Sequence, residues 1–395
     1  MKNHRIYLGL ALFFFLLLLI GRAGKPELYA GPEALLFGWE QGPAYTFPAI
    51  ARAFGESAQS VLGSALWAFR FPVLFLALGL LLLISSLGRV LFGESRKNLL
   101  LVVLMSSFGL QFVSWQFSGD LWLLTALIGY GLLTLLYLKR RAWEQLLGSL
   151  LFLALALWIA WLPALVASLV FWLMLRFFHP FGKCLTAWYP LLLWLGSLGL
   201  GLWAYLPYEP AVFFLALPWH GARATFPEFL EVFTGKGHWG LGPYLLVQLA
   251  ALLPWFGFLA AGLYELFVNL RRGEEMSLVA TSFLLAGFLS FGLLPQWVFA
   301  LLIARQLEGY VQKNYPYENL VKGFAILELV LSFALVFVAV FLGAMAGSGG
   351  FGSLAWKGLL WWGPSVVGVL GLFMKKPGMY IGGPLFAAFL GSLTV

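Results

Sequence analysis

The sequence predicts an all-α protein, a polytopic transmembrane bundle of about thirteen helical spans. Its 395 residues are 62% hydrophobic and only 10% charged, with a mean hydropathy of +0.92, so too few polar side chains are present to cover a water-exposed surface. Apolar stretches of helical length recur along the whole chain, and the basic residues sort to one side of them. The composition therefore predicts that lipid covers most of the surface.

The thirteen apolar stretches make residues 1–395 a single predicted membrane domain without a soluble carboxy-terminal domain. The first stretch follows Lys2 and Arg5, and its exit, Gly21-Arg-Ala-Gly-Lys-Pro26, lacks the small-x-small pattern of a cleavage site. We therefore interpret it as an uncleaved anchor. The spans are expected at residues 6–21, 71–93, 98–117, 121–138, 144–162, 163–178, 185–204, 241–268, 277–294, 296–312, 321–346, 356–374 and 378–395.

The distribution of charge predicts the orientation of the bundle. With these spans, 17 of the 24 lysines and arginines fall on the side of the amino terminus, together with 8 of the 16 acids. Lysine and arginine in short loops resist translocation, so the amino terminus is predicted in the cytoplasm and Val395 outside, in a multi-pass inner (cytoplasmic) membrane protein. The excess positive charge matches anionic lipid head groups, and we exclude nucleic acid as a partner.

Two outer segments are longer than the other connections. Residues 22–70 contain two stretches of helical period, Pro32–Trp39 and Phe47–Phe54, and residues 205–240 contain a third, Phe226–Phe233. Each is expected to lie as a helix in the membrane interface with its apolar face among the lipid head groups.

Ionisable side chains are scarce on the outer side, and carboxylates there are candidate catalytic groups. Glu33 and Asp120 are predicted to border one cleft above the bundle, where they are candidate catalytic groups, although a solvated surface charge is the simpler interpretation of any one acid. Ser107, Gln111, Ser114 and Ser118 form a polar stripe that leads to Asp120 along the third span. The stripe either joins helices or lines the cleft.

Basic side chains on the outer side are candidate phosphate ligands. Guanidinium groups hold phosphate by paired hydrogen bonds, and the alternative is interfacial snorkelling to lipid phosphates. The predicted phosphate- or lipid-binding residues are Arg52, Arg70, Arg223 and Lys236.

The predicted substrate cleft also contains aromatic and polar side chains of the two long segments. Trp39 and Trp219 stand apart from the aromatic belt and are able to stack on a sugar. No acid lies at metal-ligand spacing beside His220 or His238, so no metal site is predicted. The cleft residues are expected to be Trp39, Gln41, Tyr45, Trp219, His220 and His238.

Two acids lie inside or at the edge of predicted spans. Glu265 and Glu328 both fall near predicted cytoplasmic ends, where Arg271, Arg305 or Lys322 are available as partners. We therefore expect structural ion pairs for both, although an acid within a membrane is also a functional candidate.

Short motifs occur in a characteristic order along the chain. The first outer segment contains Pro32-Glu33 and then Gln41-Gly-Pro43-Ala-Tyr45, and the second span is entered through Arg70-Phe-Pro72 and left through Gly88-Arg-Val-Leu-Phe-Gly93. Further motifs follow in the second half of the predicted membrane region and at the top of the third span. They are Ser118-Gly-Asp120, Gly237-His-Trp-Gly-Leu-Gly-Pro-Tyr244, Leu253-Pro-Trp255 and Leu294-Pro-Gln296.

In this order and spacing the chain resembles the polytopic GT-C glycosyltransferases, particularly the aminoarabinose transferases and protein O-mannosyltransferases. The resemblance covers essentially the whole membrane region and implies a GT-C-like bundle that uses a polyprenyl-phosphate sugar as donor. No cofactor is predicted, with a divalent metal left as the open alternative. It also implies an acid pair at the start of the first loop, where this chain has Pro32-Glu33, and a lysine where it has Gln41. Because proline cannot accept a proton, the catalytic base would have to be Glu33.

The sequence thus predicts two functions that share one fold. In the first, a glycosyltransferase on the outer face moves a sugar from polyprenyl phosphate to a lipid or protein hydroxyl, with Glu33 as base, Asp120 positioning the acceptor or base, and Arg70 on the phosphate. In the second, a catalytically lapsed subunit binds lipid or partner proteins in a larger envelope complex. A secondary transporter is a weaker third reading because no paired repeat is visible.

Overall fold

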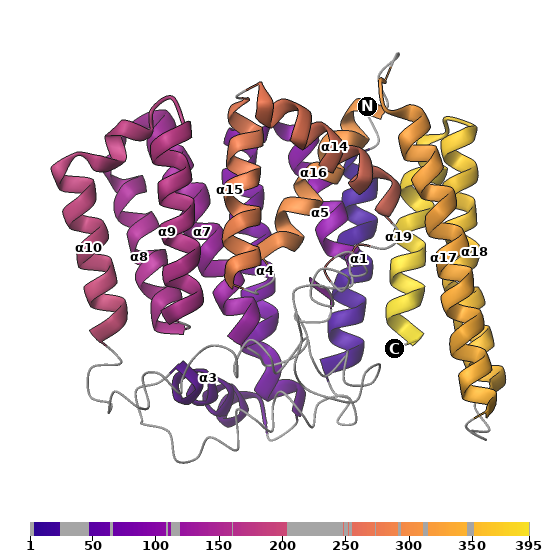
Figure 1. The fold of residues 1–395 in the computed structure, drawn as a ribbon. Coiled ribbons are helices and arrows are strands. Elements are labelled where there is room, and N and C mark those ends of the chain that lie inside the picture. The colour runs from indigo at the N-terminus through magenta and orange to yellow at the C-terminus, as the bar shows by residue number, and fades with distance from the viewer. Residues whose placement is uncertain are drawn as a thin grey trace.

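The computed structural model describes most of the chain and is helical throughout the described part. The described residues are 4–23, 47–63, 66–107, 110–111, 119–159, 161–203, 248, 252, 255–272, 274–290, 294–310, 315–345 and 351–394. No β-strand occurs in these ranges. The predicted all-α class is therefore confirmed (Figure 1).

Thirteen long helices correspond one to one with the thirteen predicted spans. A further helix, α3 (Phe47–Leu62), and a short 3₁₀ helix, η1 (Gly182–Thr186), complete the described elements. The long helices are α1 (His4–Ala23), α4 (Leu66–Phe92), α5 (Glu94–Met105), α7 (Gly119–Arg140), α8 (Trp143–Ile159), α9 (Trp161–Phe178), α10 (Trp188–Trp203), α14 (Phe256–Arg271), α15 (Glu275–Ser290), α16 (Leu294–Tyr310), α17 (Glu318–Met345), α18 (Phe351–Phe373) and α19 (Pro377–Thr394).

The long helices alternate in direction between two ends of the bundle. The connections of α4 to α5, α7 to α8 and α18 to α19 lie at one end, at the top of Figure 1, and carry Arg89, Arg140 and Lys375. We name this the basic end, and the end that carries α3 the outer end. Helix α1 begins at the basic end and α19 finishes toward the outer end (Figure 1).

Helices α5 and α16 form the centre of the bundle. From Leu99 to Met105 every residue of α5 is buried, and fourteen residues of α16 are buried, among them Trp297 at 0% exposure. A helix that is apolar on all sides is stable only when other helices surround it. Helices α1, α4 and α14 provide that cover, with α7 to α10 and α15 on one side and α17 to α19 on the other (Figure 1).

The sides of the bundle expose apolar side chains, as contact with lipid requires. Large apolar side chains such as Leu82, Phe177 and Phe337 are more than 60% exposed, and a continuous surface of this kind is unusual on a protein that faces water. By length and composition two described stretches, Arg70–Phe92 and Leu121–Arg140, qualify as membrane spans, and seven shorter apolar helices accompany them.

Two predicted spans are interrupted, which corrects the continuous helices expected there. The predicted span 98–117 ends as a helix at Met105, where the Ser106 hydroxyl donates to the carbonyls of Val102 and Val103. A new turn follows, with the Leu110 backbone N–H donating to the Ser107 hydroxyl. Within the predicted span 241–268, helix α14 begins only at Phe256, and the preceding Trp255 is not helical.

Candidate functional site

Helix α3 lies across the outer end of the bundle. It packs on α4, and its Phe54 ring stacks on Trp122 near the start of α7 with 6.2 Å between centroids. Gly63 ends α3 with a φ of 100°, and its N–H donates to the Gln59 carbonyl, a left-handed ending that favours glycine. The surface helix predicted at Phe47–Phe54 is therefore present and extends to Leu62.

Arg70 is the predicted phosphate ligand that the structure describes in full. It lies in the second turn of α4, just beneath the outer end, and is only 2% exposed. A buried guanidinium is stable only with partners, and Arg70 does interact with neighbouring groups. A fixed positive charge is thus present where the outer segment enters the bundle.

The other predicted site residues are described in part or not at all. Asp120 is the second residue of α7 and Arg52 belongs to α3, and for both of them the structure describes the backbone alone. Both backbones lie at the same end of the bundle as Arg70 (Figure 1). The predicted residues that lie outside the described part are Glu33, Trp39, Gln41, Tyr45, Trp219, His220, Arg223, Lys236 and His238.

A buried polar junction lies where α5 ends and α14 begins. The Trp255 indole N–H donates to the Ser106 hydroxyl at 2.9 Å, and the Gln111 side-chain amide donates to the Met105 carbonyl at 2.8 Å. These bonds satisfy groups released by the breaks in the two helices, as a membrane interior demands. The part of the stripe within the described residues, Ser107 and Gln111, therefore supports a helix break and does not face lipid.

A small hollow, with room for about one water molecule, lies beside this junction. Six aliphatic side chains, from α4, α5, α7 and the turn at Leu110, line it together with Gln296 and Trp297 of α16. The Gln296 amide nitrogen donates to the side-chain oxygen of Gln248 at 2.7 Å. Its own oxygen Oε1 and the Trp297 indole N–H are buried without a hydrogen-bond partner. A water molecule or a hydroxyl group both donates and accepts hydrogen bonds, so it has the chemistry to donate to the Gln296 oxygen and to accept from the Trp297 N–H.

Within the described residues Glu328 forms no ion pair, and the bases expected as its partners, Arg271, Arg305 and Lys322, do not bind it. This α17 residue is 6% exposed, and its carboxylate accepts hydrogen bonds from the backbone N–H groups of Phe256 and Gly257. These are the first two residues of α14, whose N-terminus favours negative charge. Glu328 therefore caps a helix that begins inside the bundle.

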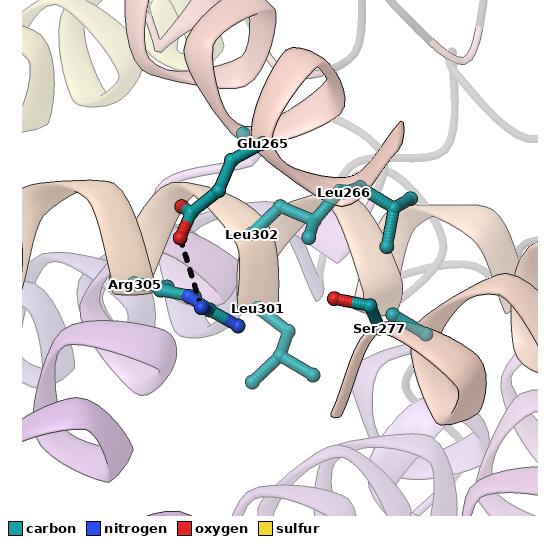
Figure 2. A pocket seen from close by; sticks show the side chains of 8 residues that line it. Glu265, Leu266, Ser277, Leu301, Leu302 and Arg305 are labelled. Atoms are coloured by element: carbon teal, nitrogen blue, oxygen red, sulfur yellow. Dashed lines mark ion pairs between the residues drawn. The ribbon is translucent and has the colours of Figure 1, made fainter. Parts of the chain in front are cut away.

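The expected pairing of Glu265 is confirmed at the basic end. Figure 2 shows its carboxylate directed at Arg305 of α16, with 2.8 Å between the charged atoms, and a small hollow borders the pair. Arg305 also binds Glu274 at 3.0 Å, and the Ser277 hydroxyl donates to the same carboxylate. Burial alone would raise the pKa of Glu274, but the bonds from Arg305 and Ser277 outweigh it and lower that pKa. The cluster joins α14, α15 and α16 and leaves no unpaired acid for catalysis.

A metal site is not indicated by the described residues, in which no three His, Cys, Asp or Glu side chains lie close enough together to hold an ion. Both outer histidines considered as ligands lie outside those residues.

The described helices, which alternate in direction and carry a surface helix at the outer end, form a polytopic membrane-type bundle. Two solved structures share it, both of ArnT from Cupriavidus metallidurans. The form bound to undecaprenyl phosphate has a TM-score of 0.61 and 14% identity, covering 98% of this chain and 76% of that chain. The apo form has a TM-score of 0.57 and 12% identity, covering 88% and 66%.

The chain thus spans about two thirds to three quarters of the length of these ArnT chains. No family model and no curated protein sequence matches it. At 12–14% identity the likeness establishes the fold, and the resemblance inferred from the order of motifs is confirmed at that level.

Sequence reasoning missed the polar junction, although the sequence contains signals for it. Pro254 lies inside a predicted span and Pro295 at the edge of another, and proline inside a membrane helix marks backbone groups that need partners elsewhere. Trp255 and Gln296, which follow these prolines, were noted only as parts of motifs. Which groups on other helices they bind depends on tertiary packing.

Proposed function

We propose that the protein is a GT-C-like membrane glycosyltransferase of the cell envelope that takes a sugar from a polyprenyl-phosphate donor at its outer end. The observation that carries the proposal is the GT-C-like fold with a buried arginine, Arg70, at the outer entrance of α4. A guanidinium withdrawn from water binds a phosphate more strongly than an exposed one. ArnT with this fold binds undecaprenyl phosphate, which supports the same class of lipid partner here.

In the proposed reaction a lipid or protein hydroxyl attacks the anomeric carbon of the donor sugar. The bond from that carbon to the phosphate oxygen breaks, and polyprenyl phosphate leaves with both electrons. Glu33 accepts the hydroxyl proton, and Asp120 orients the acceptor or the base. Arg70, with Arg52, Arg223 or Lys236, stabilises the charge on the departing phosphate. General-base help and charge stabilisation each contribute on the order of 100- to 1,000-fold.

The remaining cleft residues are proposed to bind the sugar. Trp39 and Trp219 are assigned to stacking on its ring, and polar groups of the same segments to its hydroxyls. These polar groups are Gln41, Tyr45, His220 and His238.

A second candidate is a lipid- or protein-binding subunit without transfer activity. Pro32 stands where the resemblance implies the first acid, and Gln41 where it implies a lysine. Loss of these two groups removes a base and a positive charge from one pocket while leaving the fold intact.

Binding and transfer assays on the purified protein separate the two candidates. We expect the wild type to bind undecaprenyl phosphate and to transfer a radiolabelled sugar from its glycosylated form. Glu33→Gln should bind but not transfer, Arg70→Gln should bind at least tenfold more weakly, and Glu56→Gln, an outer acid of α3, should behave as wild type. Binding by the wild type without any transfer would favour the subunit. Absence of binding by the wild type would refute both lipid-dependent functions.

A further inference from the structure

Several bases at the basic end of the central and carboxy-terminal helices are neutralised by acids of their own or of neighbouring helices. Arg96 pairs with Glu308 at 2.9 Å, and Arg305 with Glu265 at 2.8 Å. Lys322 and Lys375 both bind Glu318. These charges are used within the fold.

A different situation holds where α7 turns into α8 and α9 into α10. Five bases gather there with Glu144 as the one nearby acid, and we call them the basic turn surface: Lys139, Arg140, Arg141, Arg176 and Lys183. In the described part of the chain none of the five forms an ion pair with a carboxylate. Lys139 donates to the Val90 carbonyl at 3.3 Å.

The two turns form one continuous surface. Arg141 places its guanidinium 5.3 Å from the centre of the Phe181 ring, which precedes η1. Below them the Tyr137 and Tyr189 hydroxyls share a hydrogen bond of 2.7 Å, so α7 is joined to the start of α10. Figure 1 shows the ends of α7, α8, α9 and α10 side by side at the top of the bundle.

Exposed aromatic side chains surround the basic turn surface. Trp143 is 65% exposed and Trp188 74%, and Phe177 and Phe178 lie at the end of α9 with more than half of their surface free. Arg176 lies 5.8 Å from the centre of the Phe177 ring. Tryptophan and other aromatic residues at the ends of membrane helices lie at the level of the lipid head groups. The unpaired bases therefore lie at the level of lipid phosphates.

We propose that the basic turn surface binds the head groups of anionic phospholipids in the leaflet at the basic end. The net charge of the surface suits an anion, and three of its five bases are arginines, which hold phosphate oxygens by paired hydrogen bonds. The surrounding apolar rings favour lipid over a soluble acidic protein, because a water-soluble partner would leave them in contact with water. This inference is independent of the chemistry proposed for the outer end.

Native mass spectrometry of the purified protein tests the proposal, with phosphatidylglycerol and cardiolipin as probes and phosphatidylcholine as the neutral reference. The test variant is Arg140→Gln/Arg141→Gln/Lys183→Gln. The matched control, Arg271→Gln/Arg272→Gln/Lys376→Gln, removes three exposed bases from the same end. At about fivefold per base, the test variant should lose on the order of 100-fold in affinity for anionic lipid.

A charge-preserving variant, Arg140→Lys/Arg141→Lys, should retain more of the binding than the test variant, because it keeps the charges and loses only the paired hydrogen bonds of arginine. In the wild type, lipid binding should weaken as the salt concentration rises from 50 to 500 mM. The Debye length, over which charges attract one another, is about 10 Å at 0.1 M salt and shorter at higher concentrations. Equal losses in the test and control variants would overturn the proposal. It would also be overturned if the anionic lipids bound no better than phosphatidylcholine. Unchanged lipid binding together with loss of an acidic protein partner in the test variant would reassign the surface to that partner.

Discussion

Single buried hydrogen bonds secure the interior of this bundle. Trp255 is 0% exposed and Ser106 1%, so neither group of their shared hydrogen bond reaches water. Inside a membrane protein a lost partner leaves the remaining polar group unsatisfied, which costs more than the bond itself contributes. The two side chains thus join the broken ends of α5 and α14.

Removing the serine hydroxyl should therefore be costly. Ser106→Ala leaves the Trp255 N–H without a partner and is expected to destabilise the protein by about 1–3 kcal/mol, measured as a lower thermal midpoint in detergent. Ser282→Ala is the control, because this buried hydroxyl donates only to the Leu278 carbonyl of its own helix. An equal effect of both substitutions would contradict the importance of the junction.

The cluster around Arg305 should make stability depend on pH. The pKa of Glu274 is lowered from its ordinary value of 4.5 in the folded protein, so its contribution is present above pH 4.5 and is lost as the pH falls through the lower folded value. We expect the thermal midpoint of the wild type to fall more steeply below pH 4.5 than that of Glu274→Gln. Parallel curves for the two proteins would show that the ion pair does not stabilise the fold.

Pairs of helices approach closely where glycine removes the side chain between them. A Cβ atom on Gly383 of α19 would lie 2.5 Å from the backbone nitrogen of Gly368 in α18, whereas one on the adjacent Gly382 would meet nothing within 4 Å. Small residues of this kind allow backbone contact between membrane helices. Backbone atoms cannot move aside as a flexible side chain can.

Neighbouring glycines of α19 therefore provide a matched comparison. Gly383→Ala must separate α18 from α19 and is expected to destabilise the protein by about 1–3 kcal/mol, whereas Gly382→Ala should leave the thermal midpoint close to that of the wild type. Similar midpoints for both variants would show that the two helices separate without cost.

On the scale of the whole molecule, the fold separates two polar layers by an apolar body. The basic end carries the network around Arg305 and the basic turn surface, and the outer end carries Arg70 beneath α3. In the described part of the chain the number of long helices is odd, so α1 starts at the basic end and α19 finishes toward the outer end. The positive-inside rule predicts which of these ends is cytoplasmic.

The predicted orientation can be tested with reporters fused to the two termini. We expect alkaline phosphatase to be active only when fused after Val395, and a cytoplasmic fluorescent reporter only when fused before Met1. Activity of one reporter at both termini would refute the odd number of spans. Exchange of the two results would leave the fold intact and reverse the assignment of the outer end.

The sequence by itself determined the helical class, the approximate place of all thirteen long helices and the surface helix α3. It could do so because apolar length and helical period are local properties that neighbouring residues share. It also identified Arg70 as a candidate phosphate ligand, because the Arg70-Phe-Pro72 motif places a guanidinium at the outer start of a span.

Only the tertiary structure decided how the interior polar groups are satisfied. Three contacts join groups that are far apart along the chain. They are the hydrogen bond from Trp255 to Ser106, the capping of α14 by Glu328, and the pairing of Arg305 with two acids. A buried polar group must find a partner, but the partner depends on which helices meet. For Glu265 the correct partner was among the nearby bases, whereas for Glu328 it was a helix end, which only the packing of α17 on α14 provides.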